Sequence, residues 1–168
     1  MRKDLDSFDI DFREMDPPPS VLDVASLLKQ FLRELPLPII PHRIHQLLTA
    51  SFSSPETVKL VNVNLCLLSL PPEHLACLSY LLRHLFKVSQ NSSQNKMTVT
   101  NLAIVLTPNL LPIQDAHSAT SSNNVSTKLD KKIVEINNHK LKVHTSILAF
   151  LITNHNSIGF VDPLILEK

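Results

Sequence analysis

The chain has 168 residues, of which 43% are hydrophobic, and a formal net charge of +1. This length suits one domain with a sizeable core, and a charge near zero supplies no overall field that would hold nucleic acid or an anionic membrane. The single glycine excludes the Gly-rich loops that cradle nucleotide phosphates. We therefore expect no nucleic-acid partner, no cofactor and no small-molecule substrate of the chain's own.

The first helix with clear ends is predicted within residues 23–38, after residues 1–22, which we interpret as a remnant helix and a Pro-rich extended segment. Asp23 is expected to cap this helix, and the prolines that follow it should end it. Lys29 and Arg33 stand one turn apart, away from its apolar stripe. Two cations at this spacing are mildly unfavourable, so the pair indicates either a solvated basic edge or a partner that needs both charges.

Three more helices are predicted in the first half of the chain. They cover residues 42–50, the stretch that starts at Ser54 as a capping residue and runs to Pro71, and residues 72–88. The connections between them are short, which is typical of antiparallel neighbours in a helical bundle. The predicted fold class is all-α.

The next helix carries an apolar run. Residues 91–96 form a polar turn, after which Thr98 can cap a helix whose residues 102–106 are apolar on every side. A helix without a polar face is expected to be buried. We also expect Pro108 to stop it, because proline lacks the N–H that continues a helix.

The last third of the chain begins with a segment that is poor in apolar side chains. Residues 112–127 are predicted to form a flexible surface loop, and helical periodicity returns over 129–154, with a break expected near Asn137. We interpret residues 23–155 as one helical domain and 156–168 as a C-terminal tail.

The sequence pattern gives little support for metal binding, nucleophilic catalysis or membrane insertion. Cys66 and Cys77 fall in apolar helical runs, which suits reduced, packed thiols in the cytosol or nucleus. Of eight histidines only His42 and His45 form a close helical pair, and no cysteine or acid accompanies them at ligand spacing. No Ser or Cys has the context of a nucleophile, and the best apolar run, 58–70, is short and interrupted.

Three asparagines stand out in residues 95–111. Asn95 and Asn101 lie near predicted helix ends, where an amide can satisfy free backbone groups, so we assign them a structural role. Asn109 follows a proline and is harder to explain in this way. It joins Lys29 and Arg33 as a candidate for binding.

Two blocks of the sequence resemble the Rho GTPase-activating (RhoGAP) domain family. They are LLKQFLRELPLPIIP at residues 27–41 and NKMTVTNLAIVLTPNLL at residues 95–111, in the family's order and at a compatible distance. The resemblance spans about residues 1–155, and the tail SIGFVDPLILEK resembles one subgroup. It implies a RhoGAP-type helical bundle that docks on a GTP-bound Rho-family small GTPase and accelerates its GTP hydrolysis. The motif residues of the second block are Asn95, Lys96, Met97, Asn101 and Pro108.

The resemblance also implies roles for single residues. Lys29 and Arg33 would buttress the catalytic loop and contact the GTPase, and Asn109 would help to hold that loop. The family's catalytic arginine stands in a loop of the form G-x-x-R-x-S-G before the first block, and this sequence contains no such segment. Arg2 and Arg13 precede the block without that context. We therefore expect a bundle that lacks the N-terminal helices and the arginine-finger loop, no catalytic residue, weak stimulation and an uncovered apolar patch.

Two other hypotheses stay open. The chain could be a non-catalytic interaction module that binds GTPase switch regions or another helix, or a purely structural helical domain without a GTPase partner. Binding without faster hydrolysis would favour the first, and absence of binding would favour the second. Selectivity among Rho, Rac and Cdc42 depends on surface shape, which one sequence does not reveal.

Overall fold

The computed structural model describes residues 16–113 and 127–159, and within helix α8 it describes the side chains from residue 134 onward. The described residues form helices and no strand, so the all-α prediction is confirmed. The helices are α2 (Val21–Glu34), α3 (His42–Phe52), α4 (Glu56–Leu67), α5 (Pro72–Gln90), α6 (Ser92–Asn95), α7 (Val99–Leu110) and α8 (Thr127–Thr153). None of these helices is long and apolar enough to cross a membrane.

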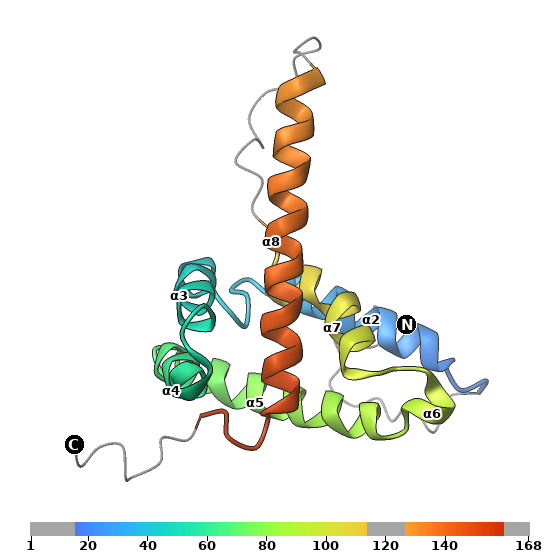
Figure 1. Ribbon diagram of the computed structural model, residues 1–168. Coiled ribbons are helices and arrows are strands. Elements are labelled where there is room, and N and C mark those ends of the chain that lie inside the picture. Colours follow the sequence, from blue (N-terminus) through green and yellow to red (C-terminus); the bar gives the residue numbers. More distant parts are fainter. Residues whose placement is uncertain (1–15, 114–126, 160–168) are drawn as a thin grey trace, which may run out of the picture.

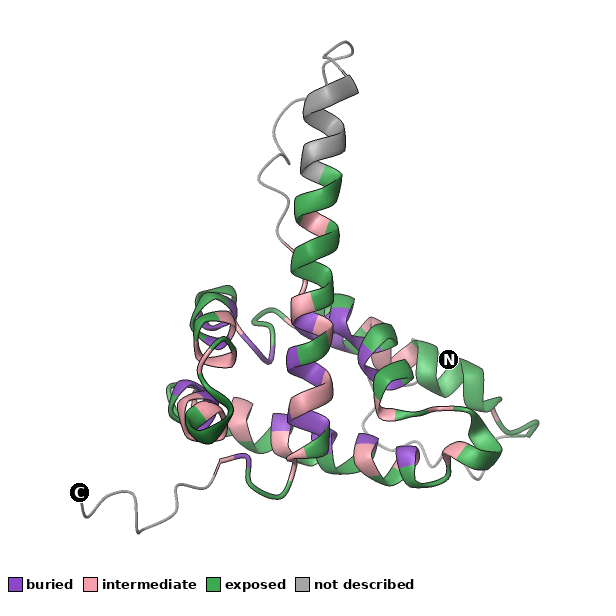
Figure 2. Cartoon of the chain, viewed as in Figure 1, coloured by how far each residue is buried: buried purple, intermediate pink, exposed green. Residues whose placement is uncertain are grey.

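The C-terminal half of α8 is the centre of the bundle. It packs against α3, α5 and α7, while α4 packs on α3 and α2 packs on α7. In Figure 1, α3 and α4 lie on one side of α8, and α2 and α7 lie on the other. Figure 2 shows buried positions along the lower half of α8 and mainly exposed positions where the described upper half projects beyond the bundle. The core is thus built around residues 144–152 of this helix.

Helix α2 begins earlier than the sequence predicts, because Ser20 and not Asp23 is its cap. The Ser20 hydroxyl oxygen accepts a hydrogen bond from the Asp23 N–H at 3.2 Å, and the hydroxyl donates to the Asp23 carboxylate at 2.7 Å. Asp23 therefore lies in the first turn, where its negative charge favours the helix N-terminus. The helix ends at Glu34, just before Pro36, as the prolines predict.

Helix α4 departs from the prediction at both ends. Pro55 and not Ser54 occupies the cap position, and the Ser54 hydroxyl instead accepts a hydrogen bond from the Asn62 amide at 2.8 Å. The helix stops at Leu67, well before Pro71. The chain then turns because the Leu70 N–H bonds to the Leu67 carbonyl and the Leu70 side chain is buried in the core.

Two expectations for α7 are wrong. Pro108 lies inside the helix, which continues through Leu110, and the helix is not buried on every side, because Ile104 is 56% exposed and Val105 is 42% exposed. Proline in a helix interior costs about 3 kcal/mol. Burial of Leu110 and of the residue after it offsets that cost, since both side chains are 1% exposed. Tertiary packing therefore overrides the local stop signal.

Helix α8 runs without the break that we expect near Asn137. Asparagine inside a helix costs only about 0.7 kcal/mol relative to alanine. The fully buried side chains of Leu148 and Leu151 anchor the same helix further along, and helix formation propagates easily from an anchored segment. Residues 114–126 of the predicted loop lie outside the described residues, as do residues 1–15 of the predicted remnant helix.

The packed part of the chain extends past residue 155, where the sequence predicts the tail to begin. Buried Asn64 donates a hydrogen bond to the Ser157 carbonyl at 2.7 Å and accepts one from the Gly159 N–H at 3.2 Å. Between them, Ile158 is 1% exposed. Gly159 adopts a φ of +84°, which L side chains rarely adopt. One asparagine on α4 thus fixes the segment that follows α8.

The two cysteines differ in environment. Both are free, as expected, but only Cys66 is buried, and Cys77 on α5 is exposed. Burial raises the pKa of the Cys66 thiol. The expectation of packed thiols therefore holds for Cys66 and is wrong for Cys77.

Stability should depend on pH through the buried His45. The pKa of His45 is lowered from 6.5 to about 4; burial is the largest cause, nearby His144 and His42 also lower it, and a hydrogen bond to the Ile40 carbonyl opposes the shift. Between pH 6.5 and 4 the unfolded chain therefore binds a proton at His45 that the folded chain does not bind. The free energy of unfolding is highest above pH 6.5 and falls as the pH drops towards 4. We expect a loss of up to about 3 kcal/mol over this window in urea unfolding at stepped pH.

Two variants isolate the contribution of His45 to this dependence. His45→Gln should flatten the dependence between pH 6.5 and 4, whereas His139→Gln, at an exposed position on α8, should leave it unchanged. An equally steep loss of stability in His45→Gln and in the parent chain would show that other groups carry it.

Candidate functional site

The structure brings Arg33 and Asn109 together, although 76 positions separate them in the chain. Arg33 lies near the end of α2, and Asn109 lies in the last turn of α7, which packs on α2. The Arg33 guanidinium Nη1 donates a hydrogen bond to Asn109 Oδ1 at 3.3 Å. The two blocks of sequence that we singled out therefore meet at these side chains.

The amide of Asn109 is held from its other side as well. Its Nδ2 donates a hydrogen bond to the Val105 carbonyl at 3.1 Å, one helical turn back. Because the amide nitrogen is committed to a carbonyl, the amide oxygen faces the guanidinium. Asn109 is 6% exposed, so this orientation is fixed in a largely buried position. Asn109 thus presents its amide oxygen as an acceptor to the exposed Arg33 side chain.

Lys29 lies one turn before Arg33 on α2 and is partly exposed. Within residues 16–113 and 127–159, its ammonium has no hydrogen-bond or ion-pair partner. Arg33 has five N–H donors and uses one of them on Asn109. The side chain of Val105 adds exposed apolar area next to Asn109. We call Lys29, Arg33, Val105 and Asn109 the α2–α7 surface; it offers hydrogen-bond donors and positive charge beside an apolar contact.

The other motif residues of the second block shape the connection into α7. Asn95 donates to the Val88 carbonyl at 2.8 Å and accepts from the Met97 N–H at 2.8 Å. Asn101 donates to the Lys96 carbonyl at 2.8 Å, and Lys96 adopts a left-handed φ of 59°. These amides satisfy backbone groups at helix ends, and none of them reaches Arg33.

Thr98 and Met97 complete this connection. Thr98 caps α7 by accepting a hydrogen bond from the Asn101 N–H at 3.2 Å, as the sequence predicts. The half-buried Met97 packs against the core just before it. Both ends of this connection are therefore held in place, which fixes the position of α7 against α2.

The sequence predicts an uncovered apolar patch but does not indicate which apolar side chains around this surface are exposed. In a run that is apolar on every side, nothing distinguishes Val105, which is exposed, from Leu106, which is buried. The apolar stripe of α2 is partly uncovered, since Leu32 is buried and Leu28 packs partly buried against the core, but Phe31 is 56% exposed. Whether a side chain on a helix face is exposed depends on which other helix packs against that face, and that helix is distant in the sequence.

Comparison with known proteins connects these features to one family. The RhoGAP domain model matches residues 2–115. Rho GTPase-activating protein 11A from Homo sapiens is 36% identical over 148 residues, which cover 87% of this chain and 13% of that protein. Rho GTPase-activating protein 10 from Mus musculus is 35% identical over 145 residues, 85% of this chain and 16% of that protein. This chain therefore spans less than a fifth of the length of these relatives.

A solved structure has the same arrangement of helices. It is the crystal structure of the BH domain from Graf, the GTPase regulator associated with focal adhesion kinase, with a TM-score of 0.67 and 25% sequence identity. The likeness covers 84% of this chain and 67% of that one. The family match at residues 2–115 includes all four residues of the α2–α7 surface.

Proposed function

This chain belongs to the RhoGAP domain family, and from this we propose that it binds a GTP-bound Rho-family small GTPase through the α2–α7 surface. It acts on the GTPase as a regulator and is not itself the enzyme. Its place is in Rho signalling.

The hydrogen bond between Arg33 and Asn109 is the observation that supports this proposal most directly. Arginine loses side-chain entropy when it binds, and a guanidinium that is already oriented loses less. The remaining donors of Arg33 form a planar fork that suits backbone carbonyls and carboxylates on a switch loop. The Lys29 ammonium stands one turn away and can meet a second acceptor on the same loop.

We further propose that this chain by itself stimulates GTP hydrolysis only weakly. A trans-acting arginine stabilises charge that develops on the phosphate groups in the transition state. Its loop form, G-x-x-R-x-S-G, does not occur in the 168 residues. Arg33 lies on helix α2 beside Asn109 and not in such a loop, which supports the proposal that it does not replace the missing arginine. We therefore expect this chain to bind the GTPase without strongly stimulating GTP hydrolysis.

The proposed binding surface is tested by alanine substitution. We expect Arg33→Ala to weaken binding to a Rho-family GTPase loaded with a non-hydrolysable GTP analogue by about tenfold or more, because it removes the oriented donors. Lys29→Ala should weaken binding by a smaller factor, since a flexible point charge contributes less. Binding to Rho, Rac and Cdc42 would be measured separately by fluorescence titration.

The matched control is Arg43→Ala, an exposed arginine at the start of α3 and outside the α2–α7 surface. It should leave the affinity within about twofold, which excludes a general loss of positive charge. Equal weakening by Arg33→Ala and Arg43→Ala would count against the surface. Absence of binding by the parent chain to all three GTPases would refute the proposed function.

A further inference from the structure

The outer face of α4 carries a row of apolar side chains that are largely exposed. They recur at i, i+3, i+7 and i+10, which is the spacing of one helix face: Val58, Val61, Leu65 and Leu68. Val58, Leu65 and Leu68 are 43%, 53% and 41% exposed, and Val61 is half-buried. A single exposed leucine is ordinary, whereas a continuous apolar row favours an interaction site. We call these four residues the α4 stripe.

The other face of α4 already supplies the contacts that hold this helix in the bundle. Val63, Cys66 and Leu67 on that face are buried in the core, so α4 is apolar on two faces. A surface helix needs only one such face. Residues 60–72 contain no charged side chain. A partner of the α4 stripe must therefore bind by burying apolar area and not by pairing charges.

The described chain ends at the border of the α4 stripe. Asn64 Nδ2 donates a hydrogen bond to the Ser157 carbonyl at 2.7 Å, and Asn64 Oδ1 accepts one from the Gly159 N–H at 3.2 Å. Asn64 lies one turn before Leu68 and one turn after Val61, so its side chain neighbours both of them along the helix. Gly159, the last described residue, is thus held beside the α4 stripe.

The sequence that follows Gly159 is itself apolar. Residues 160–168 read FVDPLILEK, in which Phe160, Val161 and the run 164–166 are apolar. An extended chain spans up to about 3.4 Å per residue, so residues 160–164 reach about 17 Å. The α4 stripe is about 15 Å long, because its ends are ten residues apart in a helix that rises about 1.5 Å per residue. The segment is therefore long enough to cover the whole stripe.

We propose that residues 160–168 dock on the α4 stripe of the same chain. Phe160 lies against Leu68, because it directly follows the anchored Gly159, and the run 164–166 lies towards Val58. The contact removes apolar side chains of both the segment and the helix from water. Any other protein that uses this face of α4 must first displace residues 160–168.

A second copy of the chain is the main alternative partner for the α4 stripe. Stable interfaces between two proteins bury about 800 Å² on each side, contributed by about 20–30 residues. The α4 stripe has four residues, which is far fewer. A segment that is already attached at Gly159 does not need so large an area, since its attachment gives an effective concentration in the millimolar range, about that of short flexible linkers. The area available therefore favours residues 160–168.

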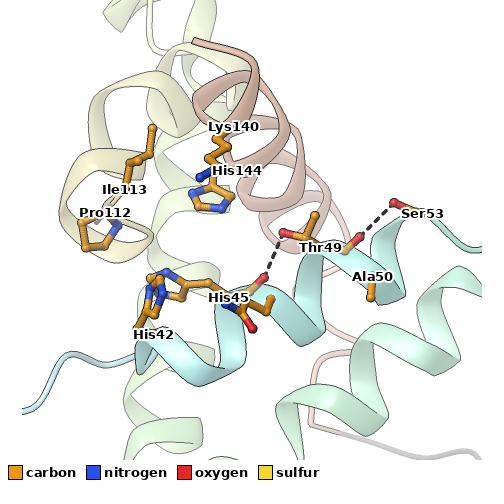
Figure 3. A pocket seen from close by; sticks show the side chains of 10 residues that line it. His42, His45, Thr49, Ala50, Ser53, Pro112, Ile113, Lys140 and His144 are labelled. Carbon is orange, nitrogen blue, oxygen red and sulfur yellow. Dashed lines mark hydrogen bonds between the residues drawn. The ribbon is translucent and has the colours of Figure 1, made fainter. Parts of the chain in front are cut away.

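The α4 stripe is separate from the pocket between α3 and α8. That pocket has a volume of about 450 Å³, and its lining includes Lys140 and two histidines that each bond to a backbone carbonyl, His45 and His144 (Figure 3). Neither the α4 stripe nor Gly159 lines it. The α4 stripe also shares no residue with the α2–α7 surface, which lies on the other side of α8 in Figure 1. Docking of the segment is therefore independent of the proposed GTPase binding.

Limited proteolysis of the intact chain tests the proposal. Chymotrypsin cleaves after phenylalanine, and a docked segment is cleaved after Phe160 only while it is undocked. Leu65→Asp places a charge in the middle of the α4 stripe and should speed this cleavage about 3- to 10-fold, because docking would then bury the carboxylate. The matched control is Ile104→Asp, at a similarly exposed aliphatic residue on α7, which should leave the rate within about 1.5-fold.

Methyl NMR identifies the partner of the α4 stripe. We expect nuclear Overhauser contacts between the Phe160 ring and the Leu68 methyl groups, and none between differently labelled copies in a mixed sample. Ile165→Asp, outside the described bundle, should shift the methyl signals of Leu65, so it decides the matter if Leu65→Asp fails to fold. Equal cleavage rates in the parent chain, Leu65→Asp and Ile104→Asp, absence of the contact to Phe160, or contacts only between copies would each overturn the proposal.

Discussion

In a single-turnover assay with a GTP-loaded Rho-family GTPase, this chain is expected to accelerate hydrolysis about 10³-fold less than a RhoGAP domain that carries the arginine loop. An arginine supplied in trans accounts for about 10³–10⁵ of the rate, or roughly 4–7 kcal/mol of transition-state stabilisation. In the proposed complex, the donors on the α2–α7 surface would contact the GTPase in the ground state and in the transition state alike. Such uniform binding increases affinity without lowering the barrier.

The assay separates weak stimulation from weak binding when the chain is present at saturating concentration. A rate enhancement of full size that is lost in Arg13→Ala or Arg2→Ala would show that one of these residues, which lie outside the described part of the chain, reaches the nucleotide. That result would overturn the proposal of weak stimulation and keep the proposal of binding. Arg33→Ala would then be expected to change the concentration for half-maximal effect more than the maximal rate.

Truncating the centre of the core should have the second largest effect. Leu148 is 0% exposed and lies on α8, the helix that packs against α3, α5 and α7. Leu148→Ala should lower the free energy of unfolding by about 3 kcal/mol, because it loses the transfer free energy of the side chain and leaves a cavity. Urea or thermal unfolding measures the loss.

Leu141→Ala is the matched control for Leu148→Ala. It makes the same chemical change on the same helix two turns earlier, where Leu141 is 38% exposed. We expect it to cost less than about 1 kcal/mol, because little apolar area is removed from water at that position on folding. Equal losses for the two variants would mean that α8 is not centred in the core as described.

Local signals in the sequence predicted every described helix except the short α6 (Ser92–Asn95), which the sequence predicts as part of a polar turn. Apolar spacing of 3–4 residues, prolines between segments and a capping Thr98 predict the other described helices, and these signals act within a few residues. The prediction was wrong where a local signal competes with packing. Pro108 does not end α7, and Asn137 does not break α8, because burial further along each helix outweighs a local cost of a few kcal/mol.

Local patterns predicted the candidate site only as separate residues, and only the resemblance to the family implied that these residues lie around one loop. Lys29 and Arg33 are recognisable because two cations one turn apart oppose helix formation, and Asn109 because no helix-end role explains it. The sequence around each of these residues carries no information about the distance between them in space. Likewise His144 gave no signal as a neighbour of His45, since α3 and α8 are separated by most of the chain.

The amino-acid sequence by itself determined the all-α class, most helix boundaries to within a turn, and the family to which the chain belongs, because helix periodicity, capping and motif spacing are short-range properties. The tertiary structure alone decided that Arg33 meets Asn109, that Val105 is exposed, and that two anchored imidazoles share a pocket. Such proximities depend on how α7 and α8 pack against α2 and α3, and packing is selected by the burial of the whole core and not by any single segment.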